Sequence, residues 1–341
     1  MSIHPPMSDY PLVSAVIPTR DRPALLACAM RSALRQTWPN LEVIVVVDGP
    51  DPLTEADLQT FADPRLRVIF LDERRGGSDA RNSGVRAACG EWIAFLDDDD
   101  EWLPDKIAQQ MRAAHAMPDW FPVVSCRLIA QSPTTSRVLP LRTYEQPQSI
   151  ADFLFCRTSL RDPGGVLQCS TLLAPRELLL AVPFKSGLPM HQDWDWLIRV
   201  AAHKGVGVAM VRQPLCIWRT EDARTTVGRN ANWSFSLSWI RQIRSVISPR
   251  AYSWFIAIQC VWRARASHAG VRARFALLRA FFFEGSPEFR SFLSFLIFAL
   301  VPVPLRRSMR KGFWKTRDLA PGLRLVSVRD PGLPVLRKSS L

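Results

Sequence analysis

The chain has 341 residues, of which 48% are hydrophobic, so it can bury a sizeable core and is not an intrinsically disordered protein. Its formal net charge of +13 is uneven, because residues 231–341 hold 19 Lys and Arg against 4 Asp and Glu, while the first 230 residues are close to neutral. A basic tail of this kind favours an anionic partner, either nucleic acid or the cytoplasmic leaflet of a membrane.

The cysteines and the N-terminus indicate a compartment. Seven cysteines, at positions 28, 89, 126, 156, 169, 216 and 260, form no CxxC pair. Their spacing favours neither a zinc site nor a disulfide framework, which indicates a reducing cytosol. The N-terminal segment has no basic head followed by an apolar stretch, so we expect no signal peptide and a cytoplasmic protein.

The first hundred residues alternate between strand and helix patterns. Short β-branched apolar runs predict buried strands, and runs of helix-forming residues between them predict helices. The expected strands cover 13–17, 41–47, 66–71 and 92–96, and the expected helices cover 23–36, 54–62 and 78–88. Such alternation predicts a mostly parallel sheet that is covered by helices on both faces.

Acidic residues follow two of these expected strands. Asp48 comes directly after strand 41–47, and four carboxylates, at positions 97 to 100, follow strand 92–96. Ligands of parallel sheets bind beyond the carboxyl ends of the strands, so we expect these residues on one rim. Crowded like charges need a counter-charge, and a divalent cation such as Mg²⁺ or Mn²⁺ suits oxygen ligands. Taken alone, an acidic tetrad is more often a solvated surface turn than a cation site.

The next hundred residues continue the mixed pattern. A helix is expected over 104–116, a strand over 122–130, a Pro/Ser/Thr-rich connector over 131–149, a second strand over 167–173 and a helix over 176–181. Another helix is expected to open near Asp193, because acidic residues suit the first turn of a helix.

Five short blocks occur in series between residues 12 and 225. They are Ile17-Pro18-Thr19-Arg20-Asp21-Arg22-Pro23, Val47-Asp48-Gly49, Gly76-Gly77-Ser78-Asp79-Ala80-Arg81-Asn82, Phe95-Leu96-Asp97-Asp98-Asp99 and Gln192-Asp193-Trp194-Asp195. In this order and spacing the chain resembles the family 2 glycosyltransferases of GT-A fold. The resemblance implies a Rossmann-like α/β domain over 1–230, with a mostly parallel sheet flanked by helices. A helical C-terminal extension would cover 231–341.

The resemblance implies roles for residues around the nucleotide. Thr19, Asp21 and Asp48 would bind the nucleotide, with the carboxylate of Asp48 accepting an N–H of the base. Arg81 would lie near the base and the diphosphate, and Asp98 near the ribose. Without the resemblance, Asp48 could be a simple turn residue and Arg81 a solvated helix residue.

The resemblance also implies the metal ligands and the catalytic base. Asp97 and Asp99 would bind Mg²⁺ or Mn²⁺, with Asp99 the best single candidate, while Asp100 would take no part. Asp193 would be the base, because a hydroxyl of the acceptor is a poor nucleophile until a carboxylate takes its proton. Alternatively, Asp193 could be only a helix N-cap. Direct displacement at the anomeric carbon would invert its configuration.

The chain departs from the family pattern at three places. Val47 stands where relatives have a second carboxylate before Asp48, Gln192 replaces a Glu before the catalytic Asp, and Glu221 stands where many relatives carry a His. Isolated histidines show no ligand spacing, and we assign them no role in binding a metal.

The basic tail is rich in aromatic residues. Segments 236–247 and 251–266 place Trp, Phe and Ile at helical spacing with Arg, and an uncharged run of 15 residues covers 291–305. That run is shorter than the roughly 20 apolar residues needed to span a membrane. Two interpretations stay open, namely amphipathic helices in the membrane interface over 231–317 and a helical cap on the catalytic domain. Residues 318–341 are expected to be poorly ordered.

The sequence therefore predicts an inverting, metal-dependent glycosyltransferase that uses a nucleotide-sugar, best matched by a UDP-sugar, at the inner face of the cell membrane. The acceptor would be a lipid-linked glycan or a polysaccharide. One alternative is a sugar-phosphate nucleotidylyltransferase, but residues 18–23 lack the Gly-rich loop that such an enzyme needs. Another is a basic nucleic-acid-binding protein, although an aromatic and apolar tail favours lipid, and we expect no nucleic acid.

Overall fold

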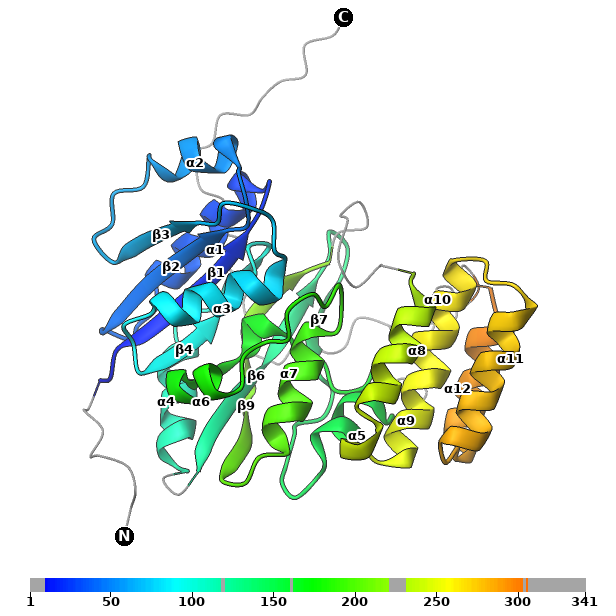
Figure 1. Cartoon of the computed structure of the whole chain (residues 1–341). Coiled ribbons are helices and arrows are strands. Elements are labelled where there is room, and N and C mark those ends of the chain that lie inside the picture. The colour runs from blue at the N-terminus through cyan, green and yellow to red at the C-terminus, as the bar shows by residue number, and fades with distance from the viewer. Residues whose placement is uncertain (1–9, 118–119, 160–161, 221–230, 303–304, 306–341) are drawn as a thin grey trace, which may run out of the picture.

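The computed structural model describes residues 10–117, 120–159, 162–220, 231–302 and 305 (Figure 1). In this part of the chain nine strands form one mixed sheet, in the order β3-β2-β1-β4-β8-β6-β9-β5, with β7 paired to β6. The strands are β1 (Val13–Thr19), β2 (Leu41–Val47), β3 (Leu66–Phe70), β4 (Trp92–Phe95), β5 (Asp100–Trp102), β6 (Phe121–Gln131), β7 (Ser136–Leu139), β8 (Leu173–Pro175) and β9 (Val206–Arg219).

The helices lie around this sheet and continue beyond it. They are α1 (Pro23–Leu34), α2 (Pro52–Leu58), α3 (Gly77–Ala87), α4 (Lys106–His115), α5 (Ile150–Phe155), α6 (Arg176–Ala181), α7 (Gln192–Ala201), α8 (Trp233–Gln242), α9 (Pro249–Phe255), α10 (Val261–Ala266), α11 (Val271–Arg279) and α12 (Phe289–Leu300). Two π-helical stretches, η4 (Ile256–Cys260) and η5 (Ala280–Glu284), connect α9 to α10 and extend α11.

The predicted strand–helix alternation of the first hundred residues is confirmed. Strand β1 pairs in parallel with both β2 and β4, and β2 pairs in parallel with β3. Alternate side chains of β2 enter two separate cores, with Ile44 and Val46 on one face and Val43, Val45 and Val47 on the other. Helix α3 packs in the first core and α1 in the second, so this part of the sheet is covered on both faces.

Beyond β4 the sheet is less parallel than predicted. Strand β8 runs antiparallel to β4 and β6, and β5 runs antiparallel to β9, whereas β6 and β9 are parallel. The prediction of a strand over 167–173 is wrong, because Cys169–Thr171 form a 3₁₀ turn and β8 begins only at Leu173. The Ser170 side chain there forms hydrogen bonds with the acidic segment, defined as Asp97–Asp100. These hydrogen bonds hold the chain in the turn. The connector 131–149 also contains a strand, β7.

The C-terminal helices share a hydrophobic core with the sheet domain. Trp239 of α8 and Phe255 of α9 belong to the same buried cluster as Phe155 of α5 and Trp196 of α7. The rings of Phe155 and Phe255 lie 5.1 Å apart. Figure 1 shows α8 and α9 beside α5 and α7, with α11 and α12 at the outer side. These helices therefore form a packed extension of the domain.

No helix within the described ranges is both long and apolar enough to cross a membrane. The predicted uncharged run 291–305 coincides largely with α12, which ends at Leu300. The expected domain boundary after residue 230, and the expected poorly ordered stretch 318–341, fall on residues outside the described ranges.

Candidate active site

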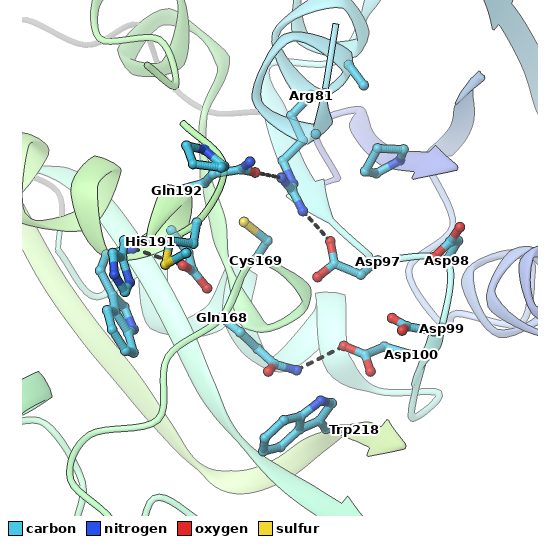
Figure 2. Close-up of a pocket in the computed structure, with 18 of the residues that line it drawn as sticks. Arg81, Asp97, Asp98, Asp99, Asp100, Gln168, Cys169, His191, Gln192 and Trp218 are labelled. Atoms are coloured by element: carbon cyan, nitrogen blue, oxygen red, sulfur yellow. Dashed lines mark hydrogen bonds and ion pairs between the residues drawn. The ribbon is translucent and has the colours of Figure 1, made fainter. Parts of the chain in front are cut away.

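A cleft of about 1070 Å³ lies at the carboxyl ends of β1, β2 and β4. The parallel register brings Thr19 beside Val47 and Val16 beside Phe95, so the segments that follow these three strands meet at one edge of the sheet. Helix α3 with the loop before it, residues 163 and 165–169, the first turn of α7 and two residues of the helical run 249–266 also line the cleft. Figure 2 shows the acidic segment on one side of this cleft and His191 on the other.

The acidic segment enters a network of hydrogen bonds on the strand side. The hydroxyl of Thr19 donates to Asp98 Oδ2 at 2.9 Å. Arg22 Nη1 lies 3.1 Å from Asp98 Oδ1 and 3.2 Å from Asp99 Oδ2. Burial raises the pKa of Asp98 to about 6, because the charge of Arg22 only partly offsets burial and the nearby charge of Asp99. Arg22 therefore supplies part of the positive charge that the crowded carboxylates need.

Asp100 differs from its three neighbours in its partners, because they pair with arginines whereas Asp100 bonds to neutral side chains. It begins β5 and is buried, and its Oδ2 accepts hydrogen bonds from Ser170 Oγ at 2.6 Å and Gln168 Nε2 at 2.9 Å. Burial, followed by the charges of Asp97 and Asp99, raises the pKa of Asp100 well above its usual value. Asp100 thus joins the acidic segment to the 3₁₀ turn at Cys169–Thr171.

Arg81 connects the acidic segment to α7. It lies in α3, its Nη2 pairs with Asp97 Oδ1, and its Nη1 donates to Gln192 Oε1 at 2.9 Å (Figure 2). Arg81 is only 7% exposed, so the interpretation of it as a solvated helix residue is wrong. Burial opposes its charge, but the carboxylates of Asp97 and Asp193 help to outweigh burial, so the pKa of Arg81 is raised. Arg81 is therefore a permanent cation at the centre of the cleft.

Asp48 anchors the loop that leads into α3. Its carboxylate accepts the backbone N–H of Arg75 at 2.7 Å and of Gly76 at 2.9 Å. Gly76 is the N-cap residue of α3 and has φ +90°, a left-handed conformation that glycine adopts at little cost. Asp48 thus fixes the start of the helix that carries Arg81 in addition to lining the cleft.

Asp21 lies at the outer edge of the cleft. Its side chain is 68% exposed and pairs with Arg20 Nε at 3.1 Å. Its backbone N–H donates to Asp51 Oδ2 at 2.7 Å, and its φ is +53°. A non-glycine residue in this conformation costs free energy, and such residues cluster at functional sites. The structure therefore brings Asp21 to the cleft but does not join its carboxylate to the acidic segment.

Asp193 lies in the first turn of α7 and lines the cleft, close enough to Arg81 and Asp97 for their charges to act on it. The N-cap residue of α7 is His191, which has φ +65°, so the interpretation of Asp193 as an N-cap is wrong. Its Oδ1 accepts the backbone N–H of Trp194 at 3.1 Å. Burial raises the pKa of Asp193 to about 6, with Arg81 opposing and Asp97 adding to the shift. A carboxylate with this pKa is ionised at neutral pH and basic enough to accept a proton.

Comparison with known proteins identifies the family. Residues 14–160 match the model described as Glycosyl transferase family 2. The chain is 26% identical to the amylovoran biosynthesis glycosyltransferase AmsB of Erwinia amylovora, over 83% of this chain and 95% of that protein. Residues 14–160 form a family 2 glycosyltransferase domain. This domain favours a transferase over both alternatives, the nucleotidylyltransferase and the nucleic-acid-binding protein.

Further relatives of this glycosyltransferase match over shorter segments. It is 39% identical to the succinoglycan biosynthesis protein ExoO of Rhizobium meliloti over 33% of each chain. It is 33% identical to the UDP-Glc:alpha-D-GlcNAc-diphosphoundecaprenol beta-1,3-glucosyltransferase WfgD of Escherichia coli over 31% of this chain and 41% of that protein. The matched segments thus cover less than half the length of each of these two relatives.

Solved structures share its fold. The mannosyltransferase PcManGT of Pyrobaculum calidifontis aligns with a TM-score of 0.55 at 20% identity, over 88% of this chain and 84% of that one. Residues 1–349 of S. aureus TarS align with a TM-score of 0.52 at 15% identity, over 91% of this chain and 95% of that one. The predicted GT-A fold is therefore confirmed.

Several residues of the cleft were not predicted as site residues. They include Arg22, Gln168, Cys169, Trp218, Gln259 and Arg263. Arg22 directly follows Asp21 in the first of the five blocks, so its place in that block was a usable signal. Gln259 and Arg263 belong to the C-terminal helices, and no pattern in the sequence connects those helices to the strand ends. Glu221, where many relatives carry a His, lies outside the described residues.

Proposed function

We propose that this glycosyltransferase moves a sugar, with inversion, from a UDP-sugar to a hydroxyl of a lipid-linked or polysaccharide acceptor, and that it depends on a divalent cation. The observation that carries the proposal is the placement of Asp193, with a pKa of about 6, in one cleft with the acidic segment. Arg81 lies between the two, in contact with Asp97 and with the residue before Asp193. A proton acceptor thus faces a rim suited to a diphosphate and a cation.

The acidic rim fits a cation that is shared with the donor. Asp97 and Asp99 are partly exposed in the cleft, whereas Asp98 and Asp100 are buried. Within the described ranges, no group of three or more His, Cys, Asp or Glu could hold a metal by itself. We propose that one or two carboxylates hold Mg²⁺ or Mn²⁺ together with phosphate oxygens of the donor. Such a cation, when bound, neutralises charge on the leaving nucleotide.

We assign the donor to the strand side of the cleft. Thr19, Asp21, Asp48 and Asp98 would border the nucleoside, and Arg81 would face the diphosphate. PcManGT was solved in complex with GDP-Man and Mn²⁺, and TarS in complex with UDP-GlcNAc. The name of WfgD specifies UDP-Glc as donor and a diphosphoundecaprenol-linked sugar as acceptor. TarS and WfgD support a UDP-sugar as the donor of this chain, and WfgD supports a lipid-linked acceptor.

The proposed reaction needs one proton transfer. The acceptor hydroxyl attacks the anomeric carbon of the donor, the new C–O bond forms as the bond from that carbon to the diphosphate oxygen breaks, and the hydroxyl proton passes to the Asp193 carboxylate. Attack from the side opposite the leaving group inverts the configuration. The guanidinium groups of Arg22 and Arg81 stand where negative charge accumulates, and they need no rearrangement to stabilise it.

A donor screen tests this proposal. The purified protein is incubated with Mn²⁺ and with UDP-, GDP- or dTDP-sugars, and the release of nucleotide is measured. We expect slow hydrolysis of UDP-sugars, which stops when the cation is chelated and resumes when it is restored. Equal release from all donors, or release that continues after chelation, would contradict the proposed donor or the proposed cation.

The rate is expected to fall at acid pH. Transfer requires ionised Asp193, so kcat/KM should drop about tenfold per pH unit below a midpoint near 6. The folded pKa of Asp193 lies above its usual value of 3.8, so its protonation stabilises the folded state as pH falls through 6. Unfolding should therefore not accompany the loss. The pH profile of kcat/KM, recorded with Tm at each pH, checks this; a profile that stays flat down to pH 5 would exclude Asp193 as the base.

We further propose that the outer helices contact the membrane at its cytoplasmic face. Phe283 and Phe289 are 84% and 79% exposed, and Phe275 is also exposed. Arg272 and Arg274 are exposed on the same helix as Phe275. Exposed aromatic residues interleaved with cations suit an anionic lipid surface, where rings enter the interface and Arg reaches phosphates. Such contact would bring the cleft close to a lipid-linked acceptor.

A vesicle assay tests this contact. Replacing Phe283 and Phe289 together by Ser should reduce cosedimentation with vesicles containing anionic phosphatidylglycerol at least about fivefold. The reason is that the variant loses the apolar area that these two side chains would bury in the membrane interface. The matched control is Leu53→Ser, since Leu53 is 76% exposed on α2, far from these helices (Figure 1). Unchanged binding of the double variant, or an equal loss for Leu53→Ser, would rule out the outer helices as the membrane contact.

A further inference from the structure

We propose that Arg263, supported by Gln259, binds an anionic group of the acceptor in the same cleft. This inference rests on the proposed function and extends it, because it names a chemical feature of the acceptor and assigns its recognition to the C-terminal helices. The proposed ligand is an oxyanion, either the diphosphate of a lipid-linked acceptor or the carboxylate of an acidic sugar.

The local helix geometry presents both residues to the cleft. Helix α9, the π-helical stretch η4 and helix α10 form one continuous helical run from Pro249 to Ala266. Gln259 lies in the π-helical stretch, Arg263 lies four residues later, and both line the cleft. A π-helical turn inside a helix is rare and occurs frequently at functional sites. The unusual backbone thus coincides with the part of the helix that faces the cleft.

Arg263 is a buried cation whose donors are only partly used. The residue is 3% exposed, and its Nε has no hydrogen-bond partner. Its Nη1 donates to the carbonyl and the side-chain oxygen of Gln259, and its guanidinium lies 5.1 Å from the ring of Trp262. These are neutral partners, and no ion pair joins Arg263 to a carboxylate of the described residues.

A buried guanidinium without an anion is costly. Burial lowers the pKa of Arg263, although an arginine remains charged at any physiological pH. Removing a charge from water carries a large desolvation penalty that an opposite charge must offset. Because Arg263 lines the cleft, an anionic ligand can reach it and supply that charge. A planar guanidinium with free donors also matches the geometry of phosphate and carboxylate oxygens.

The position of Arg263 indicates the acceptor rather than the donor. Burial and then the charge of Arg263 lower the pKa of His191, so Arg263 lies near that residue. His191 directly precedes α7, which carries Asp193 in its first turn, and in Figure 2 it lies across the cleft from Asp98 and Asp99. An acceptor must approach from the side opposite the leaving diphosphate. Arg263 therefore stands on the side of the approaching acceptor.

Aromatic residues next to this position suit the remainder of an acceptor. The rings of His191 and Trp194 are stacked 5.1 Å apart, and both residues line the cleft. Aromatic faces bind the apolar faces of sugar rings and the start of an isoprenoid chain through their apolar area. The combination of a cation and an aromatic wall fits an acceptor that carries both an anion and a ring or chain.

The test measures anion binding with the donor side filled. The full-length protein is saturated with UDP and Mn²⁺ and titrated by calorimetry with geranyl diphosphate, methyl glucuronide or neutral methyl glucoside. We expect Arg263→Gln to weaken binding of one of the two anions about ten- to hundredfold, since a charge-assisted hydrogen bond is lost. Arg263→Lys should retain part of the affinity. The control Arg112→Gln, at an exposed position of α4 that does not line the cleft, should bind as the wild type does.

The outcomes separate the sources of the anion and the two proposals. Loss for geranyl diphosphate supports the diphosphate of a lipid-linked acceptor, and loss for methyl glucuronide supports an acidic sugar. Removing an unpaired buried charge should leave Tm unchanged or raised in Arg263→Gln. Wild-type affinity in that variant, no binding of either anion to the wild type, or a lower Tm with unchanged anion binding would overturn the inference. Absence of donor hydrolysis in the wild type would instead contradict the proposed function, while anion binding that depends on Arg263 would still support this site.

Discussion

Replacing Asp193 by Asn is expected to lower kcat for sugar transfer by about 10²–10⁴-fold, the usual contribution of a general base. The amide has nearly the same shape as the carboxylate, but it cannot accept the proton of the acceptor hydroxyl. Donor affinity should change little, because the proposed donor site lies on the strand side of the cleft. Initial rates of transfer, together with the Kd of UDP in the presence of Mn²⁺, check both parts of this expectation.

Two features make the Asp193 variant interpretable. Burial raises the pKa of Asp193 to about 6, so keeping its carboxylate ionised in the folded protein costs free energy. A neutral Asn avoids this cost and should not lower Tm. Glu55→Gln is a matched control, since it removes one carboxylate from an exposed position of α2 that does not line the cleft. If Asp193→Asn retained more than a tenth of the wild-type kcat, another group would have to be the base.

Replacing Asp99 by Ala is expected to reduce kcat/KM for transfer by about 10²–10³-fold, because a bound cation supplies several kcal/mol of charge stabilisation to the leaving nucleotide. The affinity for Mn²⁺ in the presence of UDP should fall together with the rate. Titration of Mn²⁺ followed by electron paramagnetic resonance, in parallel with rates over a range of Mn²⁺ concentrations, measures both effects.

The network around Asp99 provides an independent readout. The charge of Asp99 raises the pKa of Asp98, so this pKa should fall in the Ala variant, while Arg22 keeps Asp98 as a partner. The control is Asp105→Ala, an exposed carboxylate a few residues along the chain whose side chain accepts a hydrogen bond from Thr37. Asp99→Ala with wild-type affinity for Mn²⁺ would assign the cation to other residues and leave Asp99 as a partner of Arg22.

Local sequence patterns predicted the first half of the fold well. The continuous β-branched run of β2 favours only a strand, and the helix formers of α1 favour only a helix. The carboxyl end of β2 follows directly from where its apolar run stops. Boundaries were less accurate, since α1 ends at Leu34 rather than at residue 36 and α2 covers Pro52–Leu58 rather than 54–62. The last turns of a helix depend on capping and packing, which a pattern of apolar residues reports only weakly.

The expected strand over 167–173 shows where local patterns fail. Its apolar and β-branched residues favour a strand, but Ser170 accepts the backbone N–H of Asp97 and donates to Asp100. These two hydrogen bonds join segments about seventy residues apart, and they satisfy polar groups of the buried acidic segment. A contact of this kind is a property of the folded chain, so no local pattern could have predicted it.

By itself, the sequence determined the family, the strand–helix alternation and the gathering of Asp48, Asp97, Asp98 and Asp99 at the strand ends, because parallel strands bring the residues after their carboxyl ends to one edge of the sheet. Only the tertiary structure decided which arginine side chains pair with these carboxylates. It also decided that the C-terminal helices pack on the domain and bring Arg263 into the cleft. The physical reason is that helical periodicity shows which face of a helix is apolar, whereas the element that covers this face is chosen by packing of residues far apart in the chain.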